Sequence, residues 1–192
     1  MLENLANKRI ILSSKSPRRQ ELLKGLDIDF EIEVRPVDEI YSLDLEAEKV
    51  PSFLSKLKAT AFDGDLNESD ILITSDTIVI LGSEILEKPK SEEEAKGMIR
   101  KMAGKTHTVV TGVALTSADK QEVFSDHTKV TFGELTDEEI EYYISKYKPF
   151  DKAGSYGVQE WIGYVAIDNL EGSYYNVMGL PLHKLYKALK HF

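Results

Sequence analysis

Apolar and polar residues along this chain form patterns that predict both strands and helices. Continuous apolar runs at 9–13 and 70–82 predict buried strands, and Ser75-Asp76-Thr77 divides the second into two β-rich runs. Alternation over residues 30–36 predicts a half-buried strand that ends at Pro36. Two further β-rich runs are expected to pair as strands, at residues 106–118 and 122–133.

Helical spacing and capping signals predict the helices. Pro17 suits a first helical turn with Ser16 as N-cap, and Thr136 with Glu139 matches a capping box. Other helices are expected at residues 46–63, 90–105 and 181–192. Strands and helices alternate, with one stretch of two successive strands, which predicts an α/β fold with a mixed sheet.

The composition restricts the function classes. With 192 residues the chain suits one domain, or two small lobes that share a sheet. A net charge of −9 disfavours duplex nucleic acid as a general partner, although a local basic pocket can still bind a small anion. The lack of cysteine excludes disulfides and thiolate zinc sites and fits a cytoplasmic protein. No apolar run approaches the roughly 20 residues of a membrane span, so no membrane association is expected.

The stretch "LSSKSPRRQELL", residues 12–23, places two arginines at the start of a predicted helix, where the helix dipole disfavours cations. The free backbone N–H groups there, with nearby serine hydroxyls and the Arg18 and Arg19 guanidinium groups, would form a polyphosphate cradle. The alternative is a serine-capped helix with two solvated arginines.

Asp76 is unusual because it interrupts a strongly apolar run, where a carboxylate is costly to bury unless it is paired or binds a metal. It is a candidate general base or metal ligand, with a turn aspartate between two strands as the alternative. Glu39, Lys58 and Lys88, taken singly, are expected to be surface residues rather than site residues. Two stretches rich in Gly and Tyr, at residues 149–160 and 172–182, suit either a ligand or tight turns with core tyrosines.

Eight blocks in register give the chain a resemblance to the Maf family of nucleoside triphosphate pyrophosphatases along almost its whole length. The blocks are "LSSKSPRRQELL", "VDE" at 37–39, "KA" at 58–59, "SDTIVIL", "LEKP", "GKTHTVVTGVAL", "PFDKAGSYGVQ" and "GSYYNVMGLPL". The "SSKS" start departs slightly from the family's commoner Ala-Ser pattern.

The resemblance implies a single Maf-like domain over residues 1–192, built as an elongated, twisted mixed sheet flanked by helices and related to inosine triphosphate pyrophosphatases. It further implies two lobes with an active-site cleft, and hydrolysis of a nucleoside triphosphate to the monophosphate and pyrophosphate with a divalent cation, Mg²⁺ or Mn²⁺. Many members are homodimers. The alternatives are a nucleotide-binding regulator of septum formation without turnover and a generic α/β interaction domain.

The family's motifs also imply residue roles. Asp76 takes the position of the proton acceptor, and Glu39 is expected to share a metal with it. The expected phosphate-binding residues are Ser14, Arg19, Lys58 and Lys88. Three positions separate subfamilies by nucleobase, and here they hold Arg18, Thr77 and Gln159. This combination resembles the branch that acts on dTTP and UTP.

Overall fold

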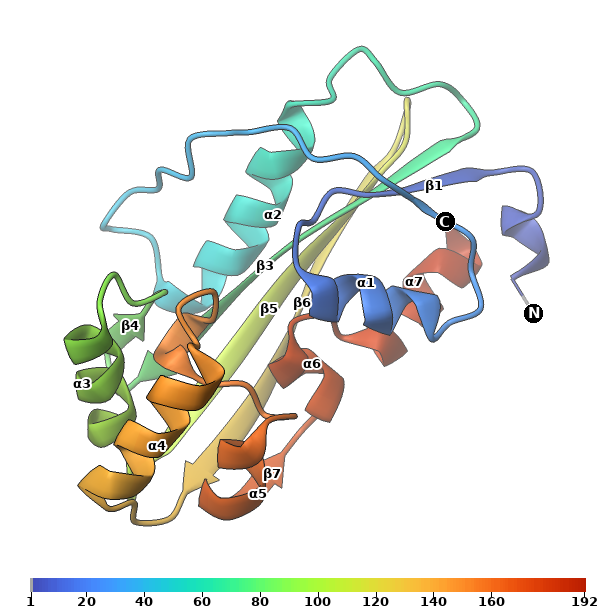
Figure 1. Cartoon of the computed structure of the whole chain (residues 1–192). Coiled ribbons are helices and arrows are strands. Elements are labelled where there is room, and N and C mark those ends of the chain that lie inside the picture. The colour runs from blue at the N-terminus through green and yellow to red at the C-terminus, as the bar shows by residue number, and fades with distance from the viewer. Residues whose placement is uncertain (1) are drawn as a thin grey trace. The chain divides into compact units, whose positions relative to one another are not determined.

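The computed structural model describes residues 2–192 as a seven-stranded mixed sheet with helices packed against it (Figure 1). The path through the sheet is β2-β1-β3-β5-β6-β7, with β4 paired to β3. β1 runs parallel to β2 and β3, whereas β4 and β7 are antiparallel to their neighbours. The predicted α/β class with a mixed sheet is therefore confirmed. The strands are β1 (Arg9–Leu12), β2 (Glu31–Ile32), β3 (Asp70–Leu81), β4 (Glu84–Leu86), β5 (Thr106–Thr116), β6 (Gln121–Phe132) and β7 (Ile167–Glu171).

The helices begin where the sequence places capping signals. Pro17 opens the first helix, and Thr136 and Glu139 form the predicted capping box. Among residues 2–192, no helix combines the length and apolar character needed to cross a bilayer. The helices are α1 (Pro17–Lys24), α2 (Val50–Thr60), α3 (Glu92–Met102), α4 (Asp137–Tyr147), α5 (Trp161–Ala166), α6 (Tyr174–Met178) and α7 (Leu182–His191), with 3-10 turns η1 (Glu3–Leu5), η2 (Ala47–Lys49) and η3 (Ala153–Ser155).

The chain divides into two compact units, each built from separate segments of sequence. Unit 1 comprises Met1–Asp76, Thr111–Asp126 and Gly179–Phe192. Unit 2 comprises Thr77–Val110 and His127–Met178. The strands β3, β5 and β6 each contribute residues to both units.

In unit 1, helix α2 packs closely on the sheet (Figure 1). Its Ala59 and the following Phe62 pack with Leu72 of β3 in a buried apolar cluster. A Cβ added at Gly112 of β5 would collide with the backbone at the start of α2, so the two backbones approach as closely as glycine permits. The Thr74 hydroxyl also donates a hydrogen bond of 2.6 Å to the Ser55 carbonyl. These contacts fix α2 against β3 and β5.

Unit 2 has its own apolar core, formed by residues from β3 to β7 and from α3 to α6. Helices α3 and α4 lie side by side at one end of this core (Figure 1). Lys96 of α3 forms an ion pair of 3.1 Å with Glu141 of α4, and Arg100 pairs with Asp137 at 2.5 Å.

Two local predictions from the sequence are wrong. Only Glu31 and Ile32 of the predicted strand 30–36 pair with β1, because this segment is a sheet edge whose charged side chains form ion pairs such as Arg35 with Glu33. Its apolar residues stay exposed, with Ile32 at 53%. β3 is one continuous strand rather than two, so Asp76 lies within a strand and not in a turn.

The tyrosines of the two Gly- and Tyr-rich stretches, which the sequence left open between a ligand site and the core, divide between the core and the surface. Tyr156 of the first stretch is buried as a core residue, but Tyr174 and Tyr175 are 41% and 49% exposed. Both belong to the short helix α6, where the buried residue is Asn176. The Asn176 side chain donates to the Val109 carbonyl and the Thr128 hydroxyl, which anchors this helix by hydrogen bonds.

Candidate active site

Unit 1 brings Asp76, Lys58 and Glu39 together. The Lys58 ammonium donates to Oδ1 of Asp76 at 2.6 Å and lies 3.1 Å from Oε2 of Glu39. The side chains of Lys58 and Asp76 are only 16% and 13% exposed, whereas that of Glu39 is 47% exposed. The sequence predicted all three as site residues, and the structure places them around one cation.

The pairing with Lys58 explains how β3 stays continuous through a carboxylate. A mostly buried charge is costly unless an opposite charge lies within hydrogen-bond distance. The α2 backbone is fixed by the Thr74–Ser55 hydrogen bond, and Lys58 follows Ser55 by one helical turn. Asp76 follows Thr74 by two residues, so it lies on the same face of β3. The local fold thus directs these two side chains toward each other.

Arg19 is held by backbone carbonyls on two other segments of unit 1. Its Nε donates to the Gly179 carbonyl at 2.8 Å, and its Nη1 donates to the Ser75 carbonyl at 3.0 Å. Burial lowers the pKa of Arg19 from its ordinary value, while the Asp76 and Glu39 carboxylates act in the opposite direction. A guanidinium remains protonated in such a setting, so Arg19 is a fixed cation near Asp76.

The segment before α1 is built around Ser14. Ser14 is buried, its hydroxyl accepts from the Ser16 N–H at 3.2 Å, and its carbonyl accepts from the Gln20 side chain at 3.1 Å. Ser16 is the N-cap residue as predicted, but its side chain makes no capping hydrogen bond within residues 2–192. The neighbouring Arg18 is half-buried at the first turn of the helix.

The remaining predicted residues belong to unit 2. Thr77 follows Asp76 on β3 and is half-buried, whereas Lys88 is exposed on the segment after β4. The Glu87 carbonyl beside Lys88 accepts from the Gly154 N–H at 3.1 Å, which ties this segment to the loop before Gln159.

Gln159 has one unusual feature. Its Oε1 is buried, and no residue in the described range 2–192 supplies it with a hydrogen-bond donor. Buried polar atoms are nearly always hydrogen-bonded, so an acceptor of this kind calls for an explanation. An acceptor kept for a ligand donor is one such explanation.

Sequence reasoning missed the groups that hold these residues in place. The carbonyls of Ser75 and Gly179 hold Arg19, and side-chain patterns carry no information about a carbonyl. In unit 2, Tyr143, Lys152 and Glu160 form a buried polar cluster. In the sequence, Lys152 and Glu160 are charged residues within a Gly- and Tyr-rich stretch, and this pattern could have indicated the cluster.

The carboxylates around Lys58 are the candidate ligands for a divalent cation. Within residues 2–192 no group of three or more His, Cys, Asp or Glu side chains could hold a metal. The Asp76 and Glu39 carboxylates do both contact the Lys58 ammonium, so they face the same point. Mg²⁺ is typically bound by one or two carboxylates together with water and substrate phosphates, so this donor set fits such an ion in number and chemistry.

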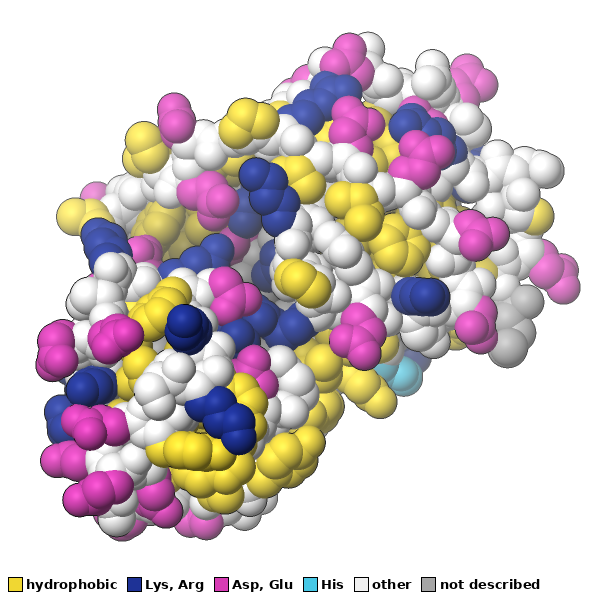
Figure 2. All heavy atoms as spheres, in the orientation of Figure 1, with side chains coloured by type: hydrophobic (Ala, Val, Ile, Leu, Met, Phe, Trp, Pro, Cys, Tyr) yellow, Lys and Arg dark blue, Asp and Glu magenta, His cyan; other side chains and the backbone are white. Residues whose placement is uncertain are grey.

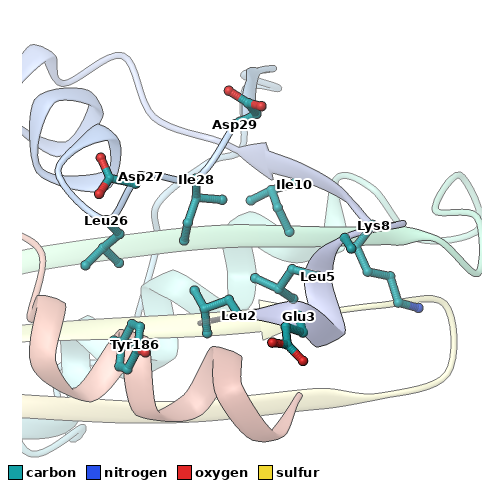
Figure 3. A pocket seen from close by; sticks show the side chains of 11 residues that line it. Leu2, Glu3, Leu5, Lys8, Ile10, Leu26, Asp27, Ile28, Asp29 and Tyr186 are labelled. Atoms are coloured by element: carbon teal, nitrogen blue, oxygen red, sulfur yellow. The ribbon is translucent and has the colours of Figure 1, made fainter.

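A separate pocket in unit 1 takes no part in this arrangement. It has a volume of about 450 Å³ and is lined by residues from η1, β1, the segment after α1 and α7, among them Leu5, Ile10, Leu26 and Tyr186 (Figure 3). Its described lining includes none of the predicted site residues.

Comparison with known proteins gives full-length relatives. The chain is 53% identical over 195 residues to a protein of Porphyromonas gingivalis named dTTP/UTP pyrophosphatase, with 100% of this chain and 98% of the relative covered. A protein of Flavobacterium psychrophilum with the same name is 52% identical over 183 residues, with 95% and 94% covered.

Among solved structures, the Staphylococcus aureus Ham1 protein aligns with a TM-score of 0.49 and 18% identity, over 65% of this chain and 72% of that one. The family described as Maf-like protein matches residues 9–192, nearly the entire chain. The chain therefore belongs to the family of Maf-like proteins.

Proposed function

We propose that this protein hydrolyses dTTP and UTP to the nucleoside monophosphate and pyrophosphate. The observation that carries the chemistry is the Lys58 ammonium bound to the Asp76 carboxylate, beside the fixed guanidinium of Arg19. Relatives about half identical over the full length are named dTTP/UTP pyrophosphatase, which supports the same activity here. The alternative of a regulator without turnover is not favoured, because binding alone does not require Asp76.

The reaction is attack of water on the α-phosphorus. Asp76 accepts a proton from the attacking water, a new P–O bond forms, and the bond to the bridging oxygen breaks so that pyrophosphate leaves. Phosphoryl-type transfer depends mainly on positioning and charge stabilisation. Lys58, Arg19 and Lys88 supply positive charge to the phosphate oxygens, and Ser14 adds a hydroxyl donor. When phosphate binds Lys58, it replaces Asp76 as a partner of the ammonium and leaves the carboxylate to act on water.

A divalent cation, Mg²⁺ or Mn²⁺, fits the same residues. Asp76 and Glu39 would hold it, since their carboxylates converge on Lys58. Such an ion would supply further stabilisation of the negative charge that develops on the triphosphate.

Base selection rests on Gln159, Thr77 and Arg18. Thymine and uracil present an N3–H donor between two carbonyl acceptors. The buried Oε1 of Gln159 is suited to accept from N3–H, and its Nε2 can donate to a carbonyl. Thr77 adds a short hydroxyl, and Arg18 can donate to the base as well as to phosphate. Cytosine reverses the pattern at N3 and at the 4-position and leaves polar groups unpaired, which costs on the order of a few kcal/mol.

The proposal is tested by a nucleotide panel. Pyrophosphate release is measured with Mg²⁺ or Mn²⁺ for dTTP, UTP, CTP, dGTP and 7-methyl-GTP, and kcat/KM values are compared. We expect dTTP and UTP to give the highest kcat/KM values, similar to each other, because no group in the sequence is assigned to the 2′-hydroxyl. Equal rates on all five nucleotides, or a preference for 7-methyl-GTP, would contradict the base assignment. Release of orthophosphate would contradict the reaction itself.

We further propose that the protein is a cytoplasmic homodimer that takes no nucleic acid as partner. Support for a dimer comes from exposed side chains of unit 2, Tyr164 at 80% and Val165 at 47%, with Tyr174 and Tyr175. Figure 2 shows hydrophobic side chains gathered over α5 and α6. On the same face, acidic side chains lie interspersed with Lys and Arg, in keeping with the net charge of −9 (Figure 2). A light-scattering mass near 21.7 kDa would reject the dimer.

A further inference from the structure

The amide of Gln159 can face a pyrimidine in two ways. With Oε1 toward N3 it accepts from the N3–H of uracil or thymine. After a half-turn about its last torsion, Nε2 donates to N3 of cytosine instead. The two orientations have nearly the same shape, so packing alone does not separate them. Selection of uracil over cytosine therefore requires a group that fixes which end of the amide points where.

The Glu160 carboxylate lies beside this amide. A Cβ added at Gly157 would lie 3.0 Å from Nε2 of Gln159, 3.0 Å from Oε2 of Glu160 and 2.8 Å from the carboxyl carbon of Glu160. Nε2 of Gln159 and Oε2 of Glu160 are therefore no more than about 6 Å apart, on the side of Gly157 where a Cβ would stand. A carboxylate attracts the partly positive NH₂ group and repels the amide oxygen, which directs Oε1 to the opposite side.

The Glu160 carboxylate is itself held on both oxygens. Oε2 accepts a short hydrogen bond from the Tyr143 hydroxyl, and Oε1 lies 3.1 Å from the Lys152 ammonium. The Tyr143 hydroxyl also accepts from the Gly157 N–H at 3.0 Å, so one group ties the carboxylate to the loop backbone. Burial, with help from the Glu160 carboxylate, raises the pKa of Tyr143, which keeps the hydroxyl protonated as a donor.

The Glu160–Lys152 ion pair is largely withdrawn from water. The side chains of Lys152 and Glu160 are only 9% and 18% exposed, and Lys152 has a second carboxylate partner, Asp151, at 2.8 Å. A pair of this kind adds little net stability compared with an apolar replacement, but it fixes the position of its members.

We propose that Glu160, held by Tyr143 and Lys152, is a positioning residue that sets the orientation of the Gln159 amide and thereby the preference for uracil and thymine over cytosine. The inference rests on the proposed function and adds a determinant outside the three specificity positions. Glu160 acts through Gln159 and touches neither base nor phosphate in this account.

The test uses the full-length protein with Glu160→Gln and Tyr143→Phe. Glu160→Gln keeps the shape of the side chain but removes its charge. Lys152 retains Asp151 as its partner, so the variant is expected to fold. The ratio of kcat/KM for UTP to that for CTP should fall about tenfold in both variants, with kcat on UTP changing less than the ratio. Tyr156→Phe is the matched control, because it removes a buried tyrosine hydroxyl of the same unit that bonds His107 instead. Its ratio should stay at the wild-type value.

A second readout does not depend on activity. The side-chain NH₂ signals of Gln159 in ¹⁵N NMR spectra, identified by their loss in Gln159→Ala, should shift and broaden in Glu160→Gln and stay in place in Tyr156→Phe. Unchanged Gln159 signals together with an unchanged UTP-to-CTP ratio would overturn the positioning role. A wild-type enzyme that does not prefer UTP over CTP would instead defeat the proposed base selection, while the NMR comparison still decides whether Glu160 orients the amide.

Discussion

In unit 1 the candidate groups are ions that neutralise one another, whereas in unit 2 the Gln159 amide is neutral and its buried oxygen has no donor among residues 2–192. The Lys58 ammonium is shared between two carboxylates, and Arg19 is fixed by two carbonyls. The carboxylate near the Gln159 amide, that of Glu160, is itself paired with Lys152.

The difference corresponds to two kinds of recognition. A triphosphate carries several charges, so a site for it needs cations that can exchange one anionic partner for another at small net cost. A base edge carries only partial charges, so it is recognised by fixed donors and acceptors whose mismatch leaves a buried group unpaired. We therefore expect changes to Lys58, Asp76 and Arg19 to alter turnover on every nucleotide, and changes around Gln159 to alter the choice of nucleotide.

The largest effect is expected for Asp76→Asn. An amide cannot accept the proton of the attacking water, so kcat should fall by about 10²-fold or more on dTTP and UTP alike. Asp126→Asn is the matched control, because Asp126 also lies on a strand of unit 1 and pairs with a lysine, Lys184, at 2.8 Å. Pyrophosphate release by Asp126→Asn should match the wild type, and equal losses in the two variants would show that the effect is structural.

A smaller loss is expected for Lys58→Ala and Lys88→Ala, each about tenfold or more in kcat/KM, since each removes one cation from the phosphate. Lys184→Ala, which also removes a lysine from an aspartate pair, is the control and should keep full activity. Thermal melts are recorded alongside. If Lys58→Ala unfolds the protein while the surviving molecules stay fully active, the lysine is structural and the account of unit 1 is wrong.

For Gln159→Glu we expect loss of selectivity rather than loss of chemistry. A carboxylate can accept from N3–H but cannot donate to a base carbonyl, so the preference of kcat/KM for UTP over CTP should fall about tenfold. Lowered rates on all nucleotides with an unchanged ratio would place Gln159 in phosphate handling and remove the contrast between the two units.

The smallest effect on turnover is expected for His107→Gln. His107 lies in the unit 2 core against Phe132 and Tyr156. Burial lowers its pKa from 6.5 to about 4. As the pH falls through this range the unfolded chain binds a proton that the folded chain does not, so stability decreases. Between pH 7.5 and pH 5, this group alone should lower the free energy of unfolding by about 2 kcal/mol.

Thermal melts of His107→Gln at these two pH values test that contribution. The variant should lose less stability than the wild type on acidification, because Gln does not titrate. The exposed His191, changed to Gln, serves as the control and should leave the acid loss unaltered. An acid loss in His107→Gln as large as that of the wild type would contradict the assignment.

Much of the fold could be predicted because it depends on local pattern. The α1 and α4 starts follow from Ser16-Pro17 and from the Thr136 capping box, which are short-range signals. Asp76 could be singled out because one carboxylate in an apolar run has few structural explanations. Its partner Lys58 required the family's motifs, because the sequence alone does not say which helix face meets β3.

The rest depends on contacts between distant residues. Residues 34–36 alternate like a strand but follow the segment that bonds to β1, which extends to the Glu33 N–H on the Leu12 carbonyl. The hydrogen bond of Tyr143 to Glu160 joins residues 17 apart, and the bonds of Arg19 to Gly179 and Ser75 span 160 and 56 residues. Spacing rules for helices and strands reach only a few residues, so such contacts follow from tertiary packing.

The central claim is that the ions of unit 1 direct water to the α-phosphorus. Hydrolysis of dTTP in ¹⁸O-labelled water, followed by mass spectrometry of both products, tests it directly. The account predicts that the label appears in dTMP and that the released pyrophosphate carries none. Label in the pyrophosphate, or orthophosphate as the labelled product, would contradict it.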